Sequence, residues 1–150
     1  MFSTPNQESL IHDRALSFLA RREHSAKELR DKLLKKFEEP EQIESVLHRL
    51  MDVGLQCDER FTELFVRHKT KTGKGPYVIR QLLLSNGIDS ELISRYMDTS
   101  LEYWLPYGQD VYQRKYRGKT IEDYADRAKR QRFLMSRGFS QDVIASVISA

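Results

Sequence analysis

Basic side chains in the second half of the sequence are the residues whose type and spacing could support chemistry. Residues 1–58 carry 9 Lys and Arg against 11 Asp and Glu, whereas residues 59–150 carry 16 against 11. The surplus positive charge of the chain therefore lies entirely after residue 58. Clustered cations attract phosphate groups and acidic protein surfaces. The sequence thus favours a binding protein with a polyanionic or acidic partner.

These cations form two groups, each with aromatic residues nearby. The first group surrounds an expected loop, and its candidate contact residues are Arg67, Lys69, Lys71, Lys74, Tyr77 and Arg80. The second group lies further along the chain, and its candidates are Arg114, Lys115, Lys119, Arg127, Lys129, Arg130 and Arg132. Exposed rings beside cations would stack on bases or anchor a protein partner.

A structural interpretation of the same residues stays open. Surface lysines can simply keep a protein soluble, and for the loop cations we weigh this interpretation evenly against a binding role. Four aromatic residues recur at matching positions of a repeat described below, and for these we favour the core: Phe61, Phe65, Tyr112 and Tyr116.

Catalytic and metal-binding patterns are missing from the sequence. The four histidines form no pair at a spacing of three or four, which would place two imidazoles on one helical face. Cys57 is the single cysteine, and the stretch Gly73 to Pro76 lacks the spaced glycine and the hydroxyl of a phosphate-binding loop. No Gly-x-Ser-x-Gly motif occurs. We therefore expect no enzyme, no metal and no cofactor.

Composition indicates the compartment. The chain has 150 residues, a formal net charge of +3, a pI near 9.0 and a mean hydropathy of −0.62. One cysteine excludes an internal disulfide and is typical of a reducing compartment. The longest apolar runs are far shorter than the roughly 18 residues that a membrane span needs. We expect a soluble, cytoplasmic monomer with no membrane partner.

Sequence patterns typical of helices occur along the whole chain, including the segments that carry these cations. In the first third, the apolar spacing predicts helices from about Gln7 to Arg22, after Ser25, and from Pro40 to Gly54. Ser25 lies three residues before Glu28, so its hydroxyl and that carboxylate can each accept a hydrogen bond from the other's backbone N–H.

Two further rounds of three helices follow. In the middle round we expect Asp58 to cap the first helix, a polar loop from Lys69 to Lys74, a helix that begins at Pro76 and ends at Gly87, and a short helix capped by Asp89 or Ser90. In the last round we expect a helix over residues 101–116, one after Thr120 that ends at Gly138, and one capped by Ser140.

A repeat of 51 residues supports this grouping. Phe37, Ile88 and Phe139 lie 51 residues apart, as do Leu83 and Leu134, and Gly87 and Gly138. The alternative is that these matches arise by chance. The first group of three helices fits the repeat only if a shift of one residue is allowed. We predict an all-α chain of three tandem three-helix repeats, over residues 1–56, 57–98 and 99–150, that forms an elongated, curved array.

Three blocks of sequence, in order along residues 12–148, add a more specific signal. The first covers residues 15–25 with Glu28-Leu29 and Lys32-Leu33. The second contains Asp58, Arg60-Phe61, Phe65, Gly73, Gly75-Pro76, Ile79-Arg80, Leu82 and Asn86-Gly87-Ile88. The third contains Trp104, Arg114-Lys115-Tyr116, Gln131-Arg132-Phe133-Leu134 and Arg137-Gly138-Phe139. In these blocks the chain resembles the RecX family, bacterial regulators of the RecA recombinase. It departs from the family pattern at Pro106, Gly108 and Arg117, which obscures where the seventh helix begins.

The resemblance implies a function. Members of the family are non-enzymatic proteins that bind the RecA nucleoprotein filament and mainly inhibit its recombinase, ATPase and co-protease activities, and so affect DNA repair by homologous recombination and the SOS response. Weak contact with single- or double-stranded DNA would be secondary. The alternative that the cations themselves suggest is an autonomous nucleic-acid-binding helical protein, which would bind DNA tightly without RecA and with a steep salt dependence.

Overall fold

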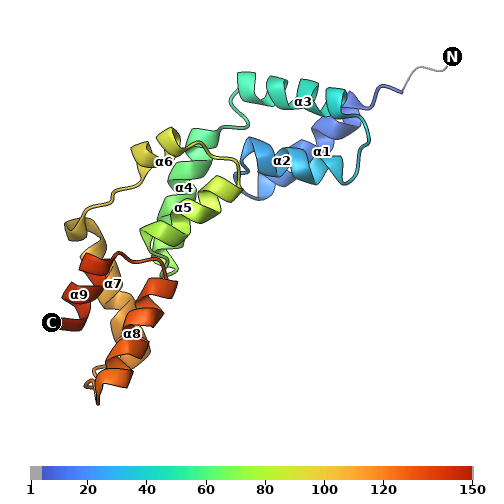
Figure 1. Ribbon diagram of the computed structural model, residues 1–150. Helices are drawn as coiled ribbons and strands as arrows, with labels where there is room; N and C mark the ends of the chain where they lie inside the picture. Colours follow the sequence, from blue (N-terminus) through green and yellow to red (C-terminus); the bar gives the residue numbers. More distant parts are fainter. Residues whose placement is uncertain (1–4, 150) are drawn as a thin grey trace. The chain divides into compact units, whose positions relative to one another are not determined.

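The computed structural model describes residues 5–149, and each regular element in that part of the chain is an α-helix (Figure 1). The helices are α1 (Glu8–Arg21), α2 (Ala26–Leu34), α3 (Pro40–Asp52), α4 (Asp58–Lys71), α5 (Pro76–Ser85), α6 (Ser90–Tyr96), α7 (Leu101–Tyr116), α8 (Tyr124–Ser136) and α9 (Gln141–Ser149). This confirms the predicted all-α fold. No helix among these is long and apolar enough to cross a membrane.

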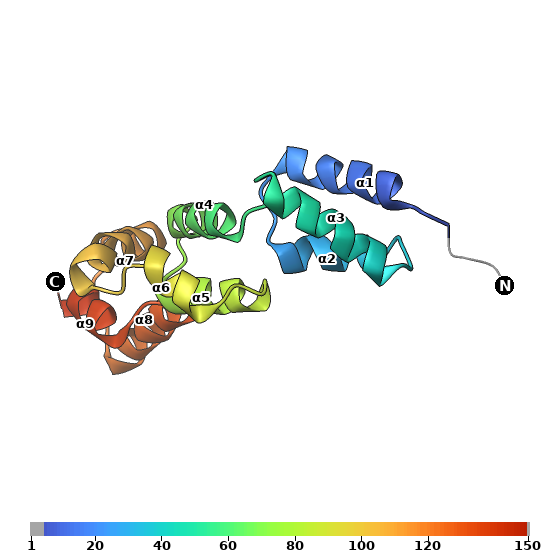
Figure 2. The ribbon, with the colours of Figure 1, turned by 90° about the horizontal axis from the view of Figure 1, so that it is seen from above.

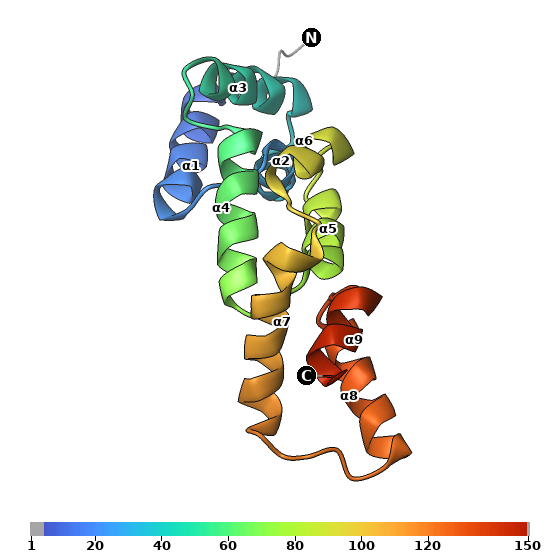
Figure 3. The same cartoon turned by 90° about the vertical axis from the view of Figure 1, so that its left-hand side faces the viewer.

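The helices belong to two compact units, with the boundary inside α4. Unit 1 comprises Met1–Leu64 with Asn86–Ile88, and unit 2 comprises Phe65–Ser85 with Asp89–Ala150. In unit 1, the helices α1, α2 and α3 all pack against one another (Figure 2). In unit 2, α9 packs against both α7 and α8, and α6 packs against α5 (Figure 3).

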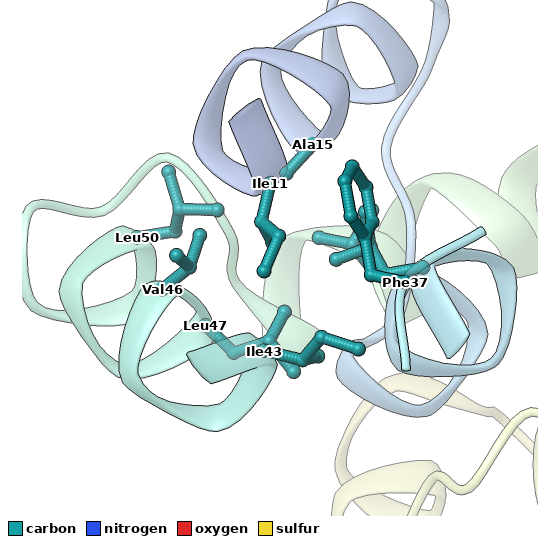
Figure 4. Close-up of a cluster of buried hydrophobic side chains, with 9 residues drawn as sticks. Ile11, Ala15, Phe37, Ile43, Val46, Leu47 and Leu50 are labelled. Carbon is teal, nitrogen blue, oxygen red and sulfur yellow. The ribbon is translucent and has the colours of Figure 1, made fainter. Parts of the chain in front are cut away.

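A hydrophobic cluster holds unit 1 together. Ile11 and Ala15 of α1 point toward Ile43, Val46 and Leu47 of α3 (Figure 4), and each of these five side chains is fully buried. Complete burial of one such aliphatic side chain contributes about 1.5–3 kcal/mol. This cluster explains why short helices that would not be stable alone persist in the unit.

Several helix ends form as the sequence predicts. Ser25 caps α2, and its hydroxyl accepts a hydrogen bond of 3.1 Å from the Glu28 N–H. The Glu28 carboxylate instead accepts two hydrogen bonds from Arg22, at 3.0 and 2.6 Å. Pro40 begins α3. Of the two candidate caps for α6, the structure selects Asp89, whose carboxylate accepts from the N–H groups of the first turn.

Two expected boundaries are wrong. Asp58 is the first residue of α4 and not its cap, and its carboxylate accepts a hydrogen bond of 2.8 Å from the Ala26 N–H at the start of α2. The polar loop is shorter than expected, because α4 continues through Lys71.

The eighth helix lies after Thr120, as expected, and the structure places its start at Tyr124. Asp123 accepts a hydrogen bond of 2.8 Å from the Asp126 N–H and caps the helix there.

The seventh helix is continuous despite Pro106 and Gly108. It ends at Tyr116, and the next residue, Arg117, adopts the left-handed conformation with φ of 50°. A residue with a Cβ atom is strained in this conformation, which glycine adopts at little cost. Arg117 therefore stands where helix geometry favours glycine.

Close backbone approaches recur 51 residues apart. In unit 2, a Cβ atom added to Gly138 would lie 2.6 Å from the Val78 nitrogen. In unit 1, a Cβ atom added to Gly87 would lie 2.7 Å from the Lys27 Cβ atom. Gly138 and Gly87 are 51 residues apart, and so are Val78 and Lys27. The same glycine contact is thus used in both units.

Gly75 completes the junction in unit 2. Its N–H donates to the Arg137 carbonyl at 2.7 Å, and the Tyr77 N–H donates to the Gly138 carbonyl at 3.0 Å. A Cβ atom on Gly75 would lie 2.5 Å from the Gly138 carbonyl carbon. These backbone hydrogen bonds fix the start of α5 against the turn between α8 and α9.

A buried histidine occupies the turn between α1 and α2. His24 is 1% exposed, and its Nδ1 lies 3.0 Å from the Arg22 carbonyl oxygen. A carbonyl can only accept, so Nδ1 carries the proton and Nε2 accepts from the Lys32 ammonium at 2.8 Å. Burial, together with the charges of Arg22 and Lys32, holds the pKa of His24 below its ordinary value.

Candidate functional site

A cationic depression of unit 2 lies among α4, α7 and α8. Four basic side chains line it together with one aromatic ring: Lys71, Arg114, Lys115, Arg137 and Phe133. Thr72, Gly73, Asp110 and Val111 complete the lining, and the volume is about 300 Å³. We call this depression the Phe133 groove. Asp110 is the one carboxylate in its lining, so the formal charge of the groove is positive.

The turn after α4 positions the first of these cations. Lys71 is the last residue of α4, and the Gly73 N–H donates to the Thr70 carbonyl at 3.1 Å. A Cβ atom on Gly73 would lie 3.3 Å from a methyl group of Val111, so this turn lies directly against α7. Lys71 is thereby placed beside the basic residues of α7.

Phe133 holds two more cations. The Lys115 ammonium and the Arg137 guanidinium each lie 5.2 Å from the centroid of its ring. The ring packs perpendicular to that of Tyr116, with centroids 5.8 Å apart and planes at 89°. A cation over an aromatic face is attracted by about 0.5–1 kcal/mol at exposed sites. The ring therefore restricts where these two charges can lie.

Arg114 has a counterion within the groove. Its Nε atom lies 3.1 Å from the Asp110 carboxylate one turn earlier in α7, and the two side chains are 76% and 58% exposed. An ion pair this exposed contributes less than about 1 kcal/mol. An incoming anion can therefore replace Asp110 at little cost.

A second depression of unit 2 contains two of the predicted residues. Tyr77, which is 61% exposed, and Arg80 border a cavity of about 220 Å³. The rest of its lining mixes apolar and hydroxyl-bearing residues: Pro76, Ile93, Ser94, Met97, Thr99 and Ser140. The first predicted group is thus divided, since Lys71 lies at the Phe133 groove and Tyr77 and Arg80 lie here.

Arg130 is not a surface cation, which corrects its place among the predicted contacts. It is 3% exposed, and its guanidinium donates to the Tyr112 hydroxyl at 2.7 Å and to the carbonyls of Lys119 and Thr120 at 2.8 and 3.2 Å. It also lies 4.3 Å from the centre of the Tyr116 ring. Hydrogen bonding to Tyr112 raises the pKa of Arg130. Arg130 therefore holds the loop between α7 and α8 in place through these hydrogen bonds.

The other predicted cations lie outside both depressions. Lys69 lies 5.3 Å from the centre of the Phe65 ring, and Lys74 is half-buried. The exposed ones are Arg67, Lys119, Arg127, Lys129 and Arg132. Their binding roles stay predictions.

The aromatic residues expected in the core differ among themselves. Phe61 is 3% exposed, as expected, whereas Phe65, Tyr112 and Tyr116 are half-buried. Partial burial raises the pKa of Tyr116. Tyr112 and Tyr116 both contact Arg130, so their rings contribute to packing within unit 2.

Sequence reasoning missed three residues of the Phe133 groove that interact with its cations or add to them: Asp110, Phe133 and Arg137. Asp110 pairs with Arg114 and Phe133 with Arg137, each at a spacing of four residues, which brings side chains together on one face of a helix. That spacing was the available signal.

Comparison with known proteins adds a family. Models described as the first, second and third three-helix domains of RecX match residues 12–50, 58–97 and 109–148. The chain belongs to the RecX family. Two relatives named Regulatory protein RecX are similar over most of their length. The one from Legionella pneumophila strain Corby is 38% identical over 135 residues, which cover 90% of each chain. One from Pseudomonas fluorescens is 40% identical over 138 residues, which cover 90% of this chain and 87% of the relative.

Solved RecX structures have the same fold. The crystal structure of RecX from Lactobacillus salivarius superposes with a TM-score of 0.79 at 26% identity and covers 95% of each chain. A second crystal structure, of a regulatory protein RecX, gives a TM-score of 0.83 at 24% identity and covers 96% of this chain and 74% of that one. The residues of the Phe133 groove come from the segments that match the second and third three-helix domains of RecX.

Proposed function

We propose that this RecX protein binds the RecA nucleoprotein filament and inhibits its recombinase, ATPase and co-protease activities without being an enzyme itself. The observation that carries the proposal is the match of all three RecX domains in order, with 38% identity to a regulatory protein RecX over 90% of the chain. A regulatory role for the family is stated in the names of these relatives.

Two surfaces of unit 2 are suited to such a partner. A nucleoprotein filament presents both protein side chains and DNA phosphates. The depression beside Tyr77 and Arg80 combines an exposed aromatic ring, apolar side chains and one cation, which is typical of protein contacts. The Phe133 groove offers cations to phosphates. A filament repeats the same sites along its axis, so one molecule can make both kinds of contact at once. The binding free energies of the two contacts would then add.

The test is the DNA-dependent ATPase activity of RecA. Substoichiometric RecX protein should slow ATP turnover, and an unchanged rate at equimolar protein would contradict the proposal. Replacing Tyr77 and Arg80 together by Ala should weaken the inhibition. Lys35→Ala is a matched control, because Lys35 is exposed at the end of α2 in unit 1. Equal inhibition by the double variant and this control would remove the Tyr77 depression from the proposed RecA contact.

Autonomous nucleic-acid binding is the second candidate function. The observation in its favour is the Phe133 groove, where four cations face one carboxylate. This function predicts tight DNA binding without RecA and a steep fall in affinity with salt. The two functions are separated by measuring the DNA affinity and RecA ATPase of the same preparation.

A further inference from the structure

Three of the four cations of the Phe133 groove have a partner in the groove before any ligand binds. Lys115 and Arg137 lie over the same aromatic ring, and Arg114 pairs weakly with Asp110. Side chains that are already restrained lose less conformational entropy on binding. Lys71 adds a fourth charge from the end of α4. The groove is therefore a partly preorganised receptor for an anion, chiefly through Lys115 and Arg137.

The aromatic ring decides which part of a nucleic acid the groove can take. Phe133 lies against two cations and packs perpendicular to the Tyr116 ring. A base would have to displace those cations in order to stack on the ring. Phosphate oxygens, in contrast, accept hydrogen bonds from the ammonium and guanidinium groups where they already lie. The fitting ligand is the backbone and not the base.

The cations have a structural explanation that must be separated from binding. Lys71 ends α4 and Arg137 caps α8, and a positive charge at the carboxyl end of a helix interacts favourably with the helix dipole. This explanation does not extend to Asp110, whose carboxylate reduces the positive charge of the groove. Asp110 is consequently the residue whose replacement distinguishes the two roles.

We propose that the Phe133 groove binds phosphodiester groups of a nucleic-acid strand and that Asp110 weakens this binding by pairing with Arg114 in the free protein. The inference rests on the proposed function in one respect: the DNA of a RecA filament would supply the phosphodiester groups. Binding replaces the Asp110 carboxylate by a phosphate oxygen at Arg114. The carboxylate then stays close to the bound phosphate, so its repulsion lowers the affinity.

The experiment measures fluorescence anisotropy of labelled single-stranded oligothymidine and of a labelled duplex, without RecA and at several salt concentrations. Asp110→Asn should tighten binding about fivefold, the equivalent of roughly 1 kcal/mol. It should also make the salt dependence steeper, because Arg114 then contributes fully to counterion release. A variant that gains affinity cannot owe its effect to misfolding.

Asp31→Asn is the matched control. Asp31 forms an exposed ion pair of the same kind with Lys27, at 2.9 Å and four residues apart, in α2 of unit 1. Both variants change the net charge equally. Equal affinities of Asp110→Asn and Asp31→Asn would overturn the inference, because only the charge of the whole chain would then matter.

Loss of binding completes the test. Arg114→Gln and Lys115→Gln should each weaken binding several-fold and make the salt dependence shallower, whereas affinity unchanged from the wild type would overturn the inference. Tighter binding of Asp110→Asn to the single strand, to the duplex or to both supports phosphodiester binding in the groove and shows which form of DNA supplies the phosphodiester groups.

Competition by inorganic phosphate, at constant ionic strength, tests whether a free phosphate occupies the same groove. If RecA inhibition fails while Asp110→Asn still binds DNA more tightly, the proposed function fails and the groove does not.

Discussion

Gly75 offers the sharpest test of how unit 2 is held together. Gly75→Ala places a methyl group 2.5 Å from the Gly138 carbonyl carbon, 2.6 Å from its oxygen and 2.7 Å from the Phe139 nitrogen. All three atoms belong to the backbone, which cannot rotate away as a side chain would. The start of α5 must therefore separate from the turn between α8 and α9.

The expected loss follows from the contacts at this junction. Overpacking a well-filled site costs about 1–3 kcal/mol. Separation also weakens the hydrogen bonds of Gly75 to Arg137 and of Tyr77 to Gly138, at about 1 kcal/mol each. We expect Gly75→Ala to reduce the free energy of unfolding by roughly 3–5 kcal/mol. That is a large part of the 5–15 kcal/mol typical of a small domain.

Trp104 makes the measurement specific to unit 2. It is the single tryptophan of the chain, it is 1% exposed, and it lies in α7. Urea unfolding followed by tryptophan fluorescence should therefore show a lower midpoint for Gly75→Ala. Gly118→Ala, also in unit 2, is the control, because nothing lies within 4 Å of a Cβ atom there and only the left-handed φ of 78° carries a cost, of about 1–2 kcal/mol. If Gly75→Ala cost no more than Gly118→Ala, the close approach would not be the constraint described above.

Three other predictions concern stability. Arg117→Gly should raise the free energy of unfolding by about 0.5–1 kcal/mol, because it relieves a left-handed arginine, and an unchanged or lower urea midpoint would argue against that strain. Arg130→Met should lower the melting temperature by calorimetry because it leaves two loop carbonyls without donors, whereas exposed Arg132→Met should not, and equal effects would refute the buried role. Since the pKa of His24 is lowered in the folded state, the unfolded chain takes up a proton first as the pH falls below about 6.5. Stability should be complete above that pH and decline below it, His24→Gln should reduce this decline, and urea midpoints that decline equally in both proteins would contradict the role of His24.

Local signals in the sequence were sufficient for most of the fold. Ser25, Pro40 and Gly87 act within one turn of a helix, and the structure places each of them where the pattern predicts. Asp58 was misassigned for the opposite reason. Its carboxylate bonds to the N–H of Ala26, which lies 32 residues earlier, and no local pattern contains that contact.

The candidate site was less predictable than the fold because charge alone does not determine exposure. Arg130 and Arg132 are two residues apart and chemically identical in the sequence, yet one is buried and the other exposed. The difference depends on Tyr112 and on loop carbonyls that only the folded chain brings to Arg130. The Phe133 groove likewise requires α4, α7 and α8 to be in place, so its combination of residues was not available from spacing along one helix.

The recurring glycine contact has a consequence for the evolution of the chain. Gly87 meets Lys27 and Gly138 meets Val78, so the two contacts are 51 residues apart along the chain. An insertion or deletion inside a helix that leads to one of these glycines would shift the glycine away from its neighbour and place a side chain there instead. The gain or loss of a whole three-helix unit, in contrast, keeps each glycine at its contact.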